Sequence, residues 1–282
     1  MNQLRNYIRL MRVKHYIKNI LVFMPLFFAG KIYDWNELSV AVTGFFAFCC
    51  VSSSVYIFND LIDLEKDQRH PTKKHRPIAS GQVSVMQAAG LIVVCLFLSV
   101  LVLVVASNPG GFVFLLLYII VNIAYSVRLK EYPIMDIVLL ASGFVIRMFY
   151  GGYLTDIPIS GWLYLVVVSG SLYMGLGKRR NELRGGGNKT RKVLKYYNYS
   201  FLEKNMYVCV ASANVFYALW AMEFRNTYMI WTVPVFMIIL MRYSFDVEGD
   251  FDGDPVEVIL QDRILITLIA AYAVCLSVLL YW

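Results

Sequence analysis

The chain has 282 residues, of which 59% are hydrophobic and only 16% are charged. A soluble domain carries about a quarter charged residues, so this composition excludes an ordinary soluble protein and indicates a membrane protein. The net charge of +7 fits basic residues gathered at the inner face of a membrane, where they attract anionic lipid or phosphate, and it does not indicate nucleic-acid binding.

Nine apolar segments approach the length of about 20 residues that a membrane span requires. They lie at residues 17–33, 38–58, 88–106, 110–126, 134–153, 160–176, 206–223, 228–242 and 263–281. If the N-terminus is inside, 23 of the 26 Lys and Arg residues fall in cytoplasmic segments. We therefore expect one all-α integral membrane domain over residues 1–282, with nine transmembrane helices, a cytoplasmic N-terminus and an external C-terminus.

Oxygen-bearing side chains follow the second apolar segment at helical spacing. Asp60, Asp63 and Asp67 share one face of a helix, and Asn59 precedes Asp63 by one turn. Mg²⁺ takes oxygen ligands and is bound by one or two carboxylates together with substrate phosphates. The pattern therefore predicts that Asn59, Asp60, Asp63 and Asp67 bind a Mg²⁺–diphosphate. The alternative is a solvated acidic loop that pairs with its basic neighbours.

The next residues, HPTKKHRPIASG at 70–81, are basic and contain two prolines. Lys73, Lys74 and Arg76 are donors that could contact the outer oxygens of a diphosphate. The two histidines lie five positions apart without a third partner, so we predict no zinc site.

A second group of polar residues follows the fourth apolar segment. Tyr125, Lys130 and Asp136 are expected near the inner surface, and Arg147 lies about three turns deeper on nearly the face of Asp136. A charge at that depth is by default a candidate functional residue. The alternatives are interfacial anchoring for Tyr125 and Lys130, and structural pairing for Arg147.

Three later segments are polar. Residues 185–188, GGGN, predict a flexible break, and the spacing of Val193, Leu194, Tyr197 and Phe201 predicts a piece lying in the headgroup region. The acidic stretch DVEGDFDGDP at 246–255 lacks the glycine of a calcium-binding EF-hand loop at its sixth position. We expect it to be a solvated loop.

Several of these stretches resemble a known family. NDLIDLEKD at 59–67 resembles the NDxxDxxxD signature of the UbiA superfamily of intramembrane prenyltransferases, and YSVRLK at 125–130 resembles its Tyr-x4-Lys motif. Four further stretches resemble the branch of polyprenyl-phosphate phosphoribosyltransferases. They are RVKHYIKNILVFMPLFFAG at 12–30, LASGFVIRMFYGG at 140–152, GSLYMGLGKRRNEL at 170–183 and LQDRIL at 260–265. The resemblance covers essentially the whole chain.

The resemblance implies an enzyme of the bacterial plasma membrane with its active site facing the cytoplasm. The implied donor is 5-phosphoribosyl diphosphate, the acceptor is a polyprenyl phosphate among the membrane lipids, and the cofactor is Mg²⁺. Diphosphate would leave from C1 of the ribose, which becomes oxocarbenium-like. The acceptor phosphate attacks from the opposite face and is already anionic, so we expect no general base.

The resemblance and the charge pattern together give the candidate site residues. Those expected to act in the chemistry are Asp60, Asp63, Asp67, Lys130 and Asp136. Those expected to bind substrate are Lys18, Asn19, Lys73, Lys74, Arg76, Tyr125, Arg147, Lys178, Arg179, Arg180, Asp262 and Arg263. For Asp262 and Arg263 the expectation rests on the resemblance, because their spacing alone indicates only an ion pair at a helix end.

One departure from the superfamily bears on the substrate. Aromatic prenyltransferases carry a second DxxxD motif that helps to bind prenyl diphosphate through magnesium, whereas here Asp136 is followed four positions later by Leu140. This departure favours phosphoribosyl transfer over the alternative, transfer of a prenyl chain to an aromatic or lipid acceptor. A lipid transporter is a further alternative, but transporters place ionisable residues near the bilayer midplane, where we expect only Arg147.

Overall fold

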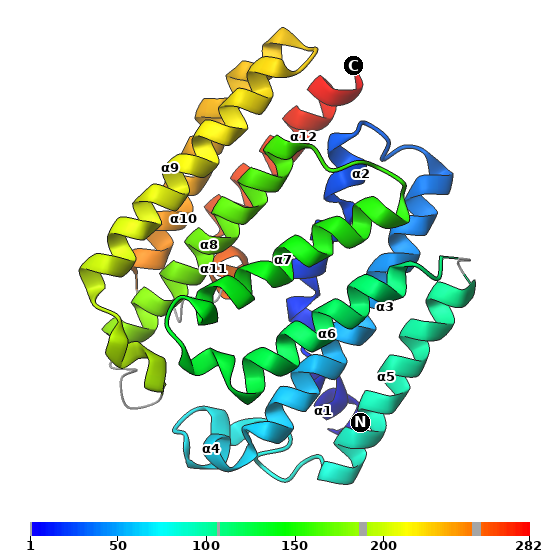
Figure 1. The fold of residues 1–282 in the computed structure, drawn as a ribbon, viewed down its shortest axis with the longest axis vertical. Coiled ribbons are helices and arrows are strands. Elements are labelled where there is room, and N and C mark those ends of the chain that lie inside the picture. Colours follow the sequence, from blue (N-terminus) through cyan, green and yellow to red (C-terminus); the bar gives the residue numbers. More distant parts are fainter. Residues whose placement is uncertain (1, 106–107, 186–190, 250–254) are drawn as a thin grey trace. The chain divides into compact units, whose positions relative to one another are not determined.

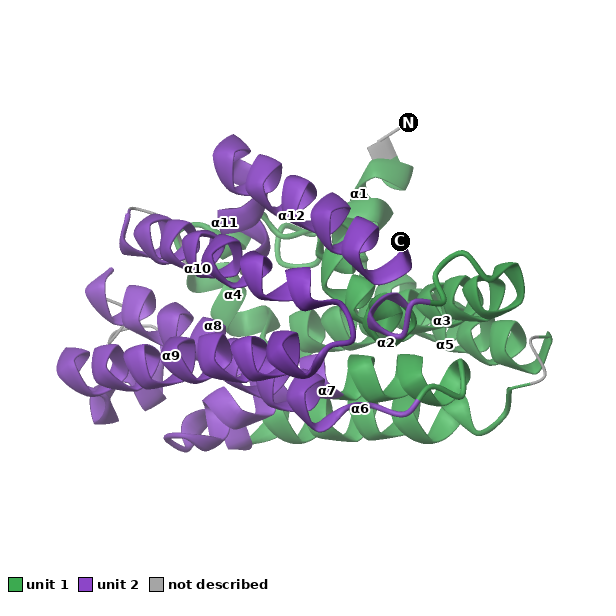
Figure 2. Cartoon of the chain, turned by 90° about the horizontal axis from the view of Figure 1, so that it is seen from above, with its two compact units in different colours: residues 1–26, 31–128, 146–157 green, residues 27–30, 129–145, 158–282 purple. Residues whose placement is uncertain are grey.

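The computed structural model describes residues 2–105, 108–185, 191–249 and 255–282, and these residues form helices and connecting turns without a β-strand (Figure 1). They divide into two compact units, which are coloured separately in Figure 2. Unit 1 comprises residues 1–26, 31–128 and 146–157, and unit 2 comprises residues 27–30, 129–145 and 158–282. The helix α7 (Met135–Leu154) contributes its first part to unit 2 and its last part to unit 1.

Unit 1 is built around the long helix α3, which packs along α5 and also contacts η1 and α6. Its elements are α1 (Asn2–Leu10), the 3₁₀ helix η1 (Val13–Phe23), most of α2 (Met24–Phe28), α3 (Trp35–Ile62), α4 (Leu64–Arg69), the 3₁₀ helix η2 (Lys73–His75), α5 (Val85–Val105) and α6 (Gly111–Val127). Asp34 caps the start of α3 by accepting a hydrogen bond of 3.0 Å from the backbone N–H of Asn36. A cap of this kind stabilises a helix by about 1 kcal/mol.

The first apolar segment does not form the single helix that its hydropathy predicts. Residues Val13–Phe23 form a 3₁₀ helix, and α2 follows. Three residues per turn bring Tyr16, Asn19 and Val22 to one face of η1. Tyr16 and Asn19 hydrogen-bond to Ser53 and Ser52 of α3 at 2.8 and 3.2 Å, and Val22 is fully buried. These contacts with α3 account for the tighter winding.

Unit 2 has a core of its own, and α8 packs along α9 within it. Its elements are η3 (Leu129–Glu131), the start of α7, α8 (Gly161–Arg184), η5 (Lys192–Tyr196), α9 (Tyr199–Glu223), η6 (Thr227–Trp231), α10 (Thr232–Glu248), α11 (Pro255–Gln261) and α12 (Arg263–Tyr281). Ser160 and Asn198 cap α8 and α9 by accepting from Leu163 N and Phe201 N at 3.1 and 2.7 Å.

The segment predicted to lie in the headgroup region begins in this core, and its location relative to the membrane stays a prediction. Val193 and Leu194 are fully buried and pack in one apolar cluster with Leu202 and Leu265. Of the four spaced residues, Val193, Leu194 and Tyr197 are buried against protein, whereas Phe201 is 39% exposed. The predicted break at 185–188 and much of the acidic loop at 246–255 lie outside the described residues.

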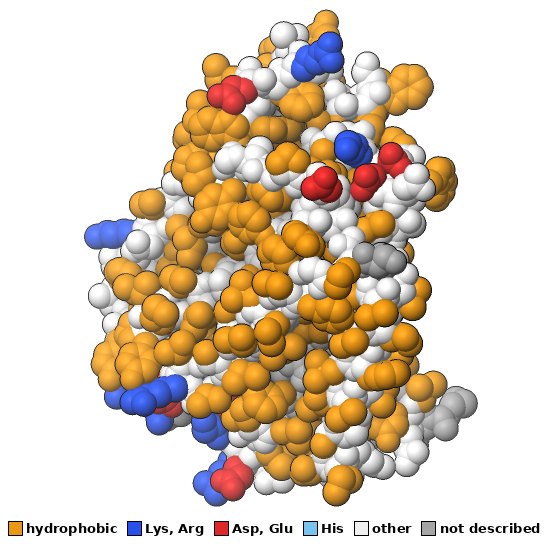
Figure 3. All heavy atoms as spheres, turned by 45° about the vertical axis from the view of Figure 1, so that its right-hand side comes forward, with side chains coloured by type: hydrophobic (Ala, Val, Ile, Leu, Met, Phe, Trp, Pro, Cys, Tyr) orange, Lys and Arg blue, Asp and Glu red, His pale blue; other side chains and the backbone are white. Residues whose placement is uncertain are grey.

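Five described helices are long and apolar enough to cross a membrane: Trp35–Ile62, Val85–Val105, Met135–Leu154, Thr227–Glu248 and Arg263–Tyr281. Figure 3 shows that hydrophobic side chains cover most of the face drawn there. On α5, Phe97 and Val104 are 64% and 58% exposed, which suits contact with lipid. The chain is therefore an all-helical protein with membrane character, whereas nine spans and the orientation of the termini stay predictions.

Candidate functional site

The acidic residues lie where α3 ends and α4 begins, in unit 1. Asp60 is in the last turn of α3, Asp63 forms the joint, and Asp67 is in α4. The backbone N–H of Asp63 donates to Asn59 O at 3.0 Å, and that of Asp67 donates to Asp63 O at 2.8 Å. The i to i−4 pattern thus runs through the joint, as the spacing of the aspartates predicted.

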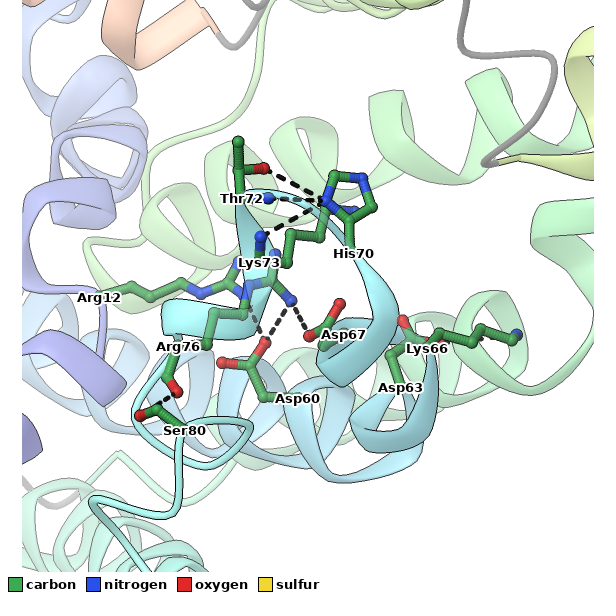
Figure 4. A network of polar contacts seen from close by, with 10 residues as sticks. All are labelled: Arg12, Asp60, Asp63, Lys66, Asp67, His70, Thr72, Lys73, Arg76 and Ser80. Atoms are coloured by element: carbon green, nitrogen blue, oxygen red, sulfur yellow. Dashed lines mark hydrogen bonds and ion pairs between the residues drawn. The ribbon is translucent and has the colours of Figure 1, made fainter.

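Arg76 bridges two of the aspartates (Figure 4). Its Nη1 lies 2.9 Å from Asp60 Oδ1 and 2.6 Å from Asp67 Oδ2. Asp60 and Asp67 are almost fully buried, at 4% and 3% exposure. Buried carboxylates require a partner of opposite charge, and the guanidinium supplies it for both. The pairing of the acids with a basic neighbour is the one that the alternative predicted, although the two aspartates are buried and not solvated; contact of Arg76 with a diphosphate stays a prediction.

A second arginine reaches the same carboxylate from far along the sequence. Arg12 Nη2 lies 2.5 Å from Asp60 Oδ1, and its guanidinium carbon lies 5.1 Å from the centre of the Tyr56 ring. Sequence reasoning missed this residue, because a basic residue before the first apolar segment also fits topology alone. The one available signal was its place at the start of the stretch 12–30, which resembles the phosphoribosyltransferase branch.

Asn59 and Asp63 have other surroundings. The Oδ1 atom of Asn59 accepts a hydrogen bond from the Ser126 hydroxyl of α6. Asp63 is partly exposed, and its Oδ1 lies 3.8 Å from Lys66 Nζ. The four predicted ligands therefore share a segment without converging, and no group of three His, Cys, Asp or Glu side chains is arranged to hold a metal ion within the described ranges.

The donor set nevertheless fits Mg²⁺. All four side chains offer oxygen atoms, and the buried pair Asp60 and Asp67 already holds a cation between its carboxylates. Mg²⁺ is commonly bound by one or two protein carboxylates, with waters and substrate phosphates completing the octahedron. A pair of carboxylates around one cation is the arrangement expected for such a site, in which the protein supplies only part of the coordination shell.

The basic loop is folded around His70. Its Nδ1 accepts from the backbone N–H groups of Thr72 and Lys73 at 3.3 and 3.4 Å. Partial burial and the neighbouring Lys73 ammonium lower the pKa of His70, which favours the neutral ring that can accept these bonds. Ser80 Oγ donates to Arg76 O at 2.8 Å and helps to fix the arginine backbone. Lys73 and Lys74 are exposed on the loop.

Arg147 and Asn19 meet inside unit 1, beside the aromatic core. Arg147 is 4% exposed, donates from Nε to Asn19 Oδ1 at 2.8 Å, and donates from Nη2 to the Tyr118 hydroxyl at 3.0 Å. Its guanidinium carbon lies 4.8 Å from the centre of the Phe48 ring. Phe48 precedes Asp60 by about 18 Å along α3. The geometry gives both predicted binding residues structural partners, and their contact with substrate stays a prediction.

Asp136 is fully buried at the start of α7 in unit 2. Its Oδ2 lies 2.5 Å from Arg179 Nε, and its Oδ1 accepts from the Tyr197 hydroxyl at 2.6 Å. Tyr197 in turn accepts from the backbone N–H of Ile134, and burial raises the pKa of its phenol. Two predicted site residues, Asp136 and Arg179, are thus brought together, but as a paired carboxylate and guanidinium.

Glu182 extends this network. Its Oε2 accepts from Arg179 Nη1 at 2.8 Å and lies 3.5 Å from Arg191 Nη1. Burial favours the neutral acid, but the two guanidinium groups prevail and hold the pKa of Glu182 below its ordinary value. Glu182 therefore adds a second negative charge beside the buried Arg179.

The remaining cations predicted in unit 2 have varied surroundings. Arg180 is buried, with Nη1 3.5 Å from Glu248 Oε1, whereas Arg263 is exposed. Lys130 of η3 and Lys178 of α8 are partly buried. In unit 1, Lys18 of η1 and Tyr125 of α6 are also partly buried.

Asp262 caps α12 through a hydrogen bond of 2.8 Å from Ile264 N. It also accepts from Arg242 Nε at 2.6 Å, and this guanidinium lowers the pKa of Asp262 to about 2. A helix-end ion pair is thus present at Asp262, with Arg242 as its partner.

The chain was compared with known proteins. Residues 20–257 match the UbiA prenyltransferase family. The chain is 34% identical to the decaprenyl-phosphate phosphoribosyltransferase of Mycolicibacterium smegmatis, over 100% of this chain and 94% of that protein. It is 33% identical to the protein of the same name from Corynebacterium glutamicum, over 97% and 86%. The fold resembles a UbiA homolog from Archaeoglobus fulgidus bound to GPP and Mg²⁺, with a TM-score of 0.74, 19% identity and 98% of each chain covered.

Proposed function

We propose a phosphoribosyltransferase function for this chain, which belongs to the UbiA prenyltransferase family. It transfers the 5-phosphoribosyl group of 5-phosphoribosyl diphosphate to a polyprenyl phosphate and releases diphosphate. The observation that supports binding of the diphosphate is the buried pair Asp60 and Asp67 with Arg76 between them. The nature of both substrates rests on the full-length relatives, which are named decaprenyl-phosphate phosphoribosyltransferases.

Asp60, Asp63 and Asp67 are the residues that would hold Mg²⁺, with Asn59 joining them if it releases Ser126. The metal would supply Lewis-acid stabilisation of the charge that develops on the departing diphosphate. Arg76 would hold an oxygen of the same diphosphate, and its guanidinium lies at the two carboxylates proposed to hold the metal. Lys73 and Lys74, exposed on the same loop, add positive charge there.

The surroundings of Asp136 support the phosphoribosyl donor over a prenyl diphosphate. Each oxygen of this carboxylate contacts a protein donor, Arg179 or Tyr197, and the pair is fully buried. Leu140, four positions later, offers no ligand. A second carboxylate pair for a second metal is therefore lacking among the described residues at this stretch. We place the reaction at the cytoplasmic face of a bacterial plasma membrane, because the basic residues gather in the segments predicted to face inward.

Asp67→Asn tests this function in a turnover assay. Purified protein receives labelled 5-phosphoribosyl diphosphate, a polyprenyl phosphate and Mg²⁺, and labelled lipid is counted. We expect transfer by the wild-type protein, loss with EDTA, and at least a roughly hundredfold fall for Asp67→Asn, because a group that stabilises the developing charge is removed. Glu65→Gln is the matched control, since Glu65 is an exposed acid of the same helix; it should retain activity.

Two outcomes would replace the proposal. If the wild-type protein makes no labelled lipid but consumes a prenyl diphosphate with an aromatic or lipid acceptor, the chain is a prenyltransferase. If purified protein in liposomes moves a lipid across the bilayer without any covalent product, it is a transporter.

A further inference from the structure

Two guanidinium groups converge on one oxygen of Asp60. Arg12 Nη2 lies 2.5 Å and Arg76 Nη1 lies 2.9 Å from Asp60 Oδ1, and the same nitrogen of Arg76 contacts Asp67 Oδ2 at 2.6 Å. The three elements involved come together from separate parts of unit 1, namely the junction before η1, the α3–α4 segment and the loop after η2 (Figure 4). Asp60 is therefore paired with two cations, one from a residue that precedes it in the sequence and one from a residue that follows it.

The bridging nitrogen of Arg76 and a metal ion exclude one another. Mg²⁺ binds oxygen at about 2.0–2.1 Å and demands a near-octahedral arrangement. A metal that ligates Asp60 Oδ1 and Asp67 Oδ2 must therefore occupy the space between these two oxygens, which Arg76 Nη1 now fills. Metal binding at this pair requires that the Arg76 guanidinium move.

The charges at this site indicate which ligand can displace the two guanidinium groups from the carboxylates. Asp60 and Asp67 carry two negative charges, and Arg12 and Arg76 balance them. A bare divalent cation would add two positive charges to this balanced and largely buried group, which is unfavourable. A diphosphate brings several negative charges and acceptor oxygens, and guanidinium groups bind such oxygens in pairs. Metal and diphosphate together thus offer each carboxylate and each arginine a new partner.

The backbone of Arg12 is fixed by its surroundings. Its backbone is in the left-handed region, at φ 54° and ψ 48°, which a residue with a side chain seldom adopts. Ser53 Oγ of α3 fixes the preceding residue by donating to Met11 O at 3.1 Å, and the Tyr56 ring lies under the guanidinium. Such a conformation persists only when its surroundings enforce it, so the fold itself directs Arg12 to Asp60.

We propose that Arg12 and Arg76 are exchangeable counter-ions that make metal binding at Asp60 and Asp67 depend on the diphosphate. The two arginines hold the carboxylates against bare Mg²⁺ and transfer to the diphosphate oxygens when the two arrive together. This inference rests on the proposed function, and it adds Arg12 as a residue that positions the donor. Because coupling between two ligands is reciprocal, the metal also strengthens the binding of diphosphate.

The test measures the affinities for Mn²⁺ and for inorganic diphosphate. The proposal predicts that removal of an arginine changes them in opposite directions. Mn²⁺ alone is titrated into the purified full-length protein, and the unbound ion is followed by electron paramagnetic resonance. Binding of radiolabelled inorganic diphosphate is then measured by equilibrium dialysis at saturating Mg²⁺. For Arg76→Gln and for Arg12→Gln we expect Mn²⁺ alone to bind at least about fivefold more tightly, and diphosphate at least about fivefold more weakly, the lower end of typical couplings.

Arg69→Gln is the matched control, because Arg69 is an exposed arginine at the end of α4 and its loss changes the net charge equally. It should leave both affinities within about twofold of wild type. Arg12→Lys and Arg76→Lys keep the charge and should return Mn²⁺ affinity toward wild type. If a glutamine variant fails to fold, Arg12→Ala or Arg76→Ala, which also removes the positive charge, provides the measurement with the same expected shifts.

The outcomes separate this inference from the function beneath it. If the glutamine variants bind Mn²⁺ no more tightly than wild type, or if both affinities fall together, the counter-ion exchange is wrong. In that case an Asp67→Asn variant that still loses diphosphate binding leaves the proposed function standing. If Asp60→Asn and Asp67→Asn change neither affinity, the metal site itself is wrong and both proposals fail.

Discussion

At the scale of single residues, the buried aspartates Asp60, Asp67 and Asp136 fall into two classes that their sequence positions do not distinguish. Asp60 and Asp67 are joined through a partly exposed arginine that belongs to a loop. Asp136 is joined to an arginine that, like itself, has no exposed surface. A buried pair of the second kind contributes to the integrity of the fold, because loss of Arg179 would leave Asp136 as an uncompensated buried charge.

Asp136→Asn should therefore destabilise the protein. The substitution removes one of the two carboxylates that contact the buried Arg179 and leaves Glu182 as its charged partner, which costs about 1–3 kcal/mol for the lost charged hydrogen bond. Unfolding of the purified protein in detergent, followed by circular dichroism, measures this loss. Glu131→Gln is the control, since it breaks only the exposed pair with Lys192 at 3.1 Å and should cost less than about 1 kcal/mol. A variant as stable as wild type but inactive would instead favour the predicted chemical role of Asp136.

At the scale of helices, the tight approach of η1 to its neighbours decides the course of the first apolar segment. Asn19 hydrogen-bonds to Ser52 and to Arg147, and Val22 fits against Gly151 of α7. Small residues permit such close approach of backbones within a membrane domain. The position of η1 in turn sets the position of Arg12, the residue immediately before it.

Gly151→Ala should disturb this packing. A Cβ atom at Gly151 would lie 2.0 Å from Val22 O, and because that atom belongs to the backbone, η1 or α7 must shift. We expect a loss of about 1–3 kcal/mol in the free energy of unfolding, as for other overpacked positions. Gly170→Ala, in α8, provides the control, because no neighbouring atom lies within 4 Å of the added Cβ. That change should stabilise the helix by about 0.5–1 kcal/mol. Equal stabilities for the two variants would contradict the close approach.

At the scale of the whole molecule, the distribution of charge and apolar surface defines how the chain meets the membrane. Long apolar helices occur in both units, and their outer side chains are largely hydrophobic. Lys and Arg residues gather in the segments that connect apolar stretches on one predicted side. An odd number of spans would then place the two termini on opposite sides of the membrane.

Reporter fusions test that arrangement. A fluorescent protein that folds only in the cytoplasm should be bright at the N-terminus, and an alkaline phosphatase that folds only outside should be active at the C-terminus. The exchanged fusions, phosphatase at the N-terminus and fluorescent protein at the C-terminus, are the matched controls and should be silent. Two termini on the same side would mean an even number of spans and would overturn the predicted topology.

The amino-acid sequence by itself determined the membrane class, the helical architecture, the family and the two segments that bear acids and bases. These properties are local, because hydropathy and helical spacing are set by residues a few positions apart. Only the tertiary structure decided that Arg12, 48 residues away, and Arg76, 16 residues away, share Asp60. It also decided that η1 is a 3₁₀ helix and that Val193 and Leu194 face protein. Such pairings depend on which helices pack together, and no periodicity within a single segment carries that information.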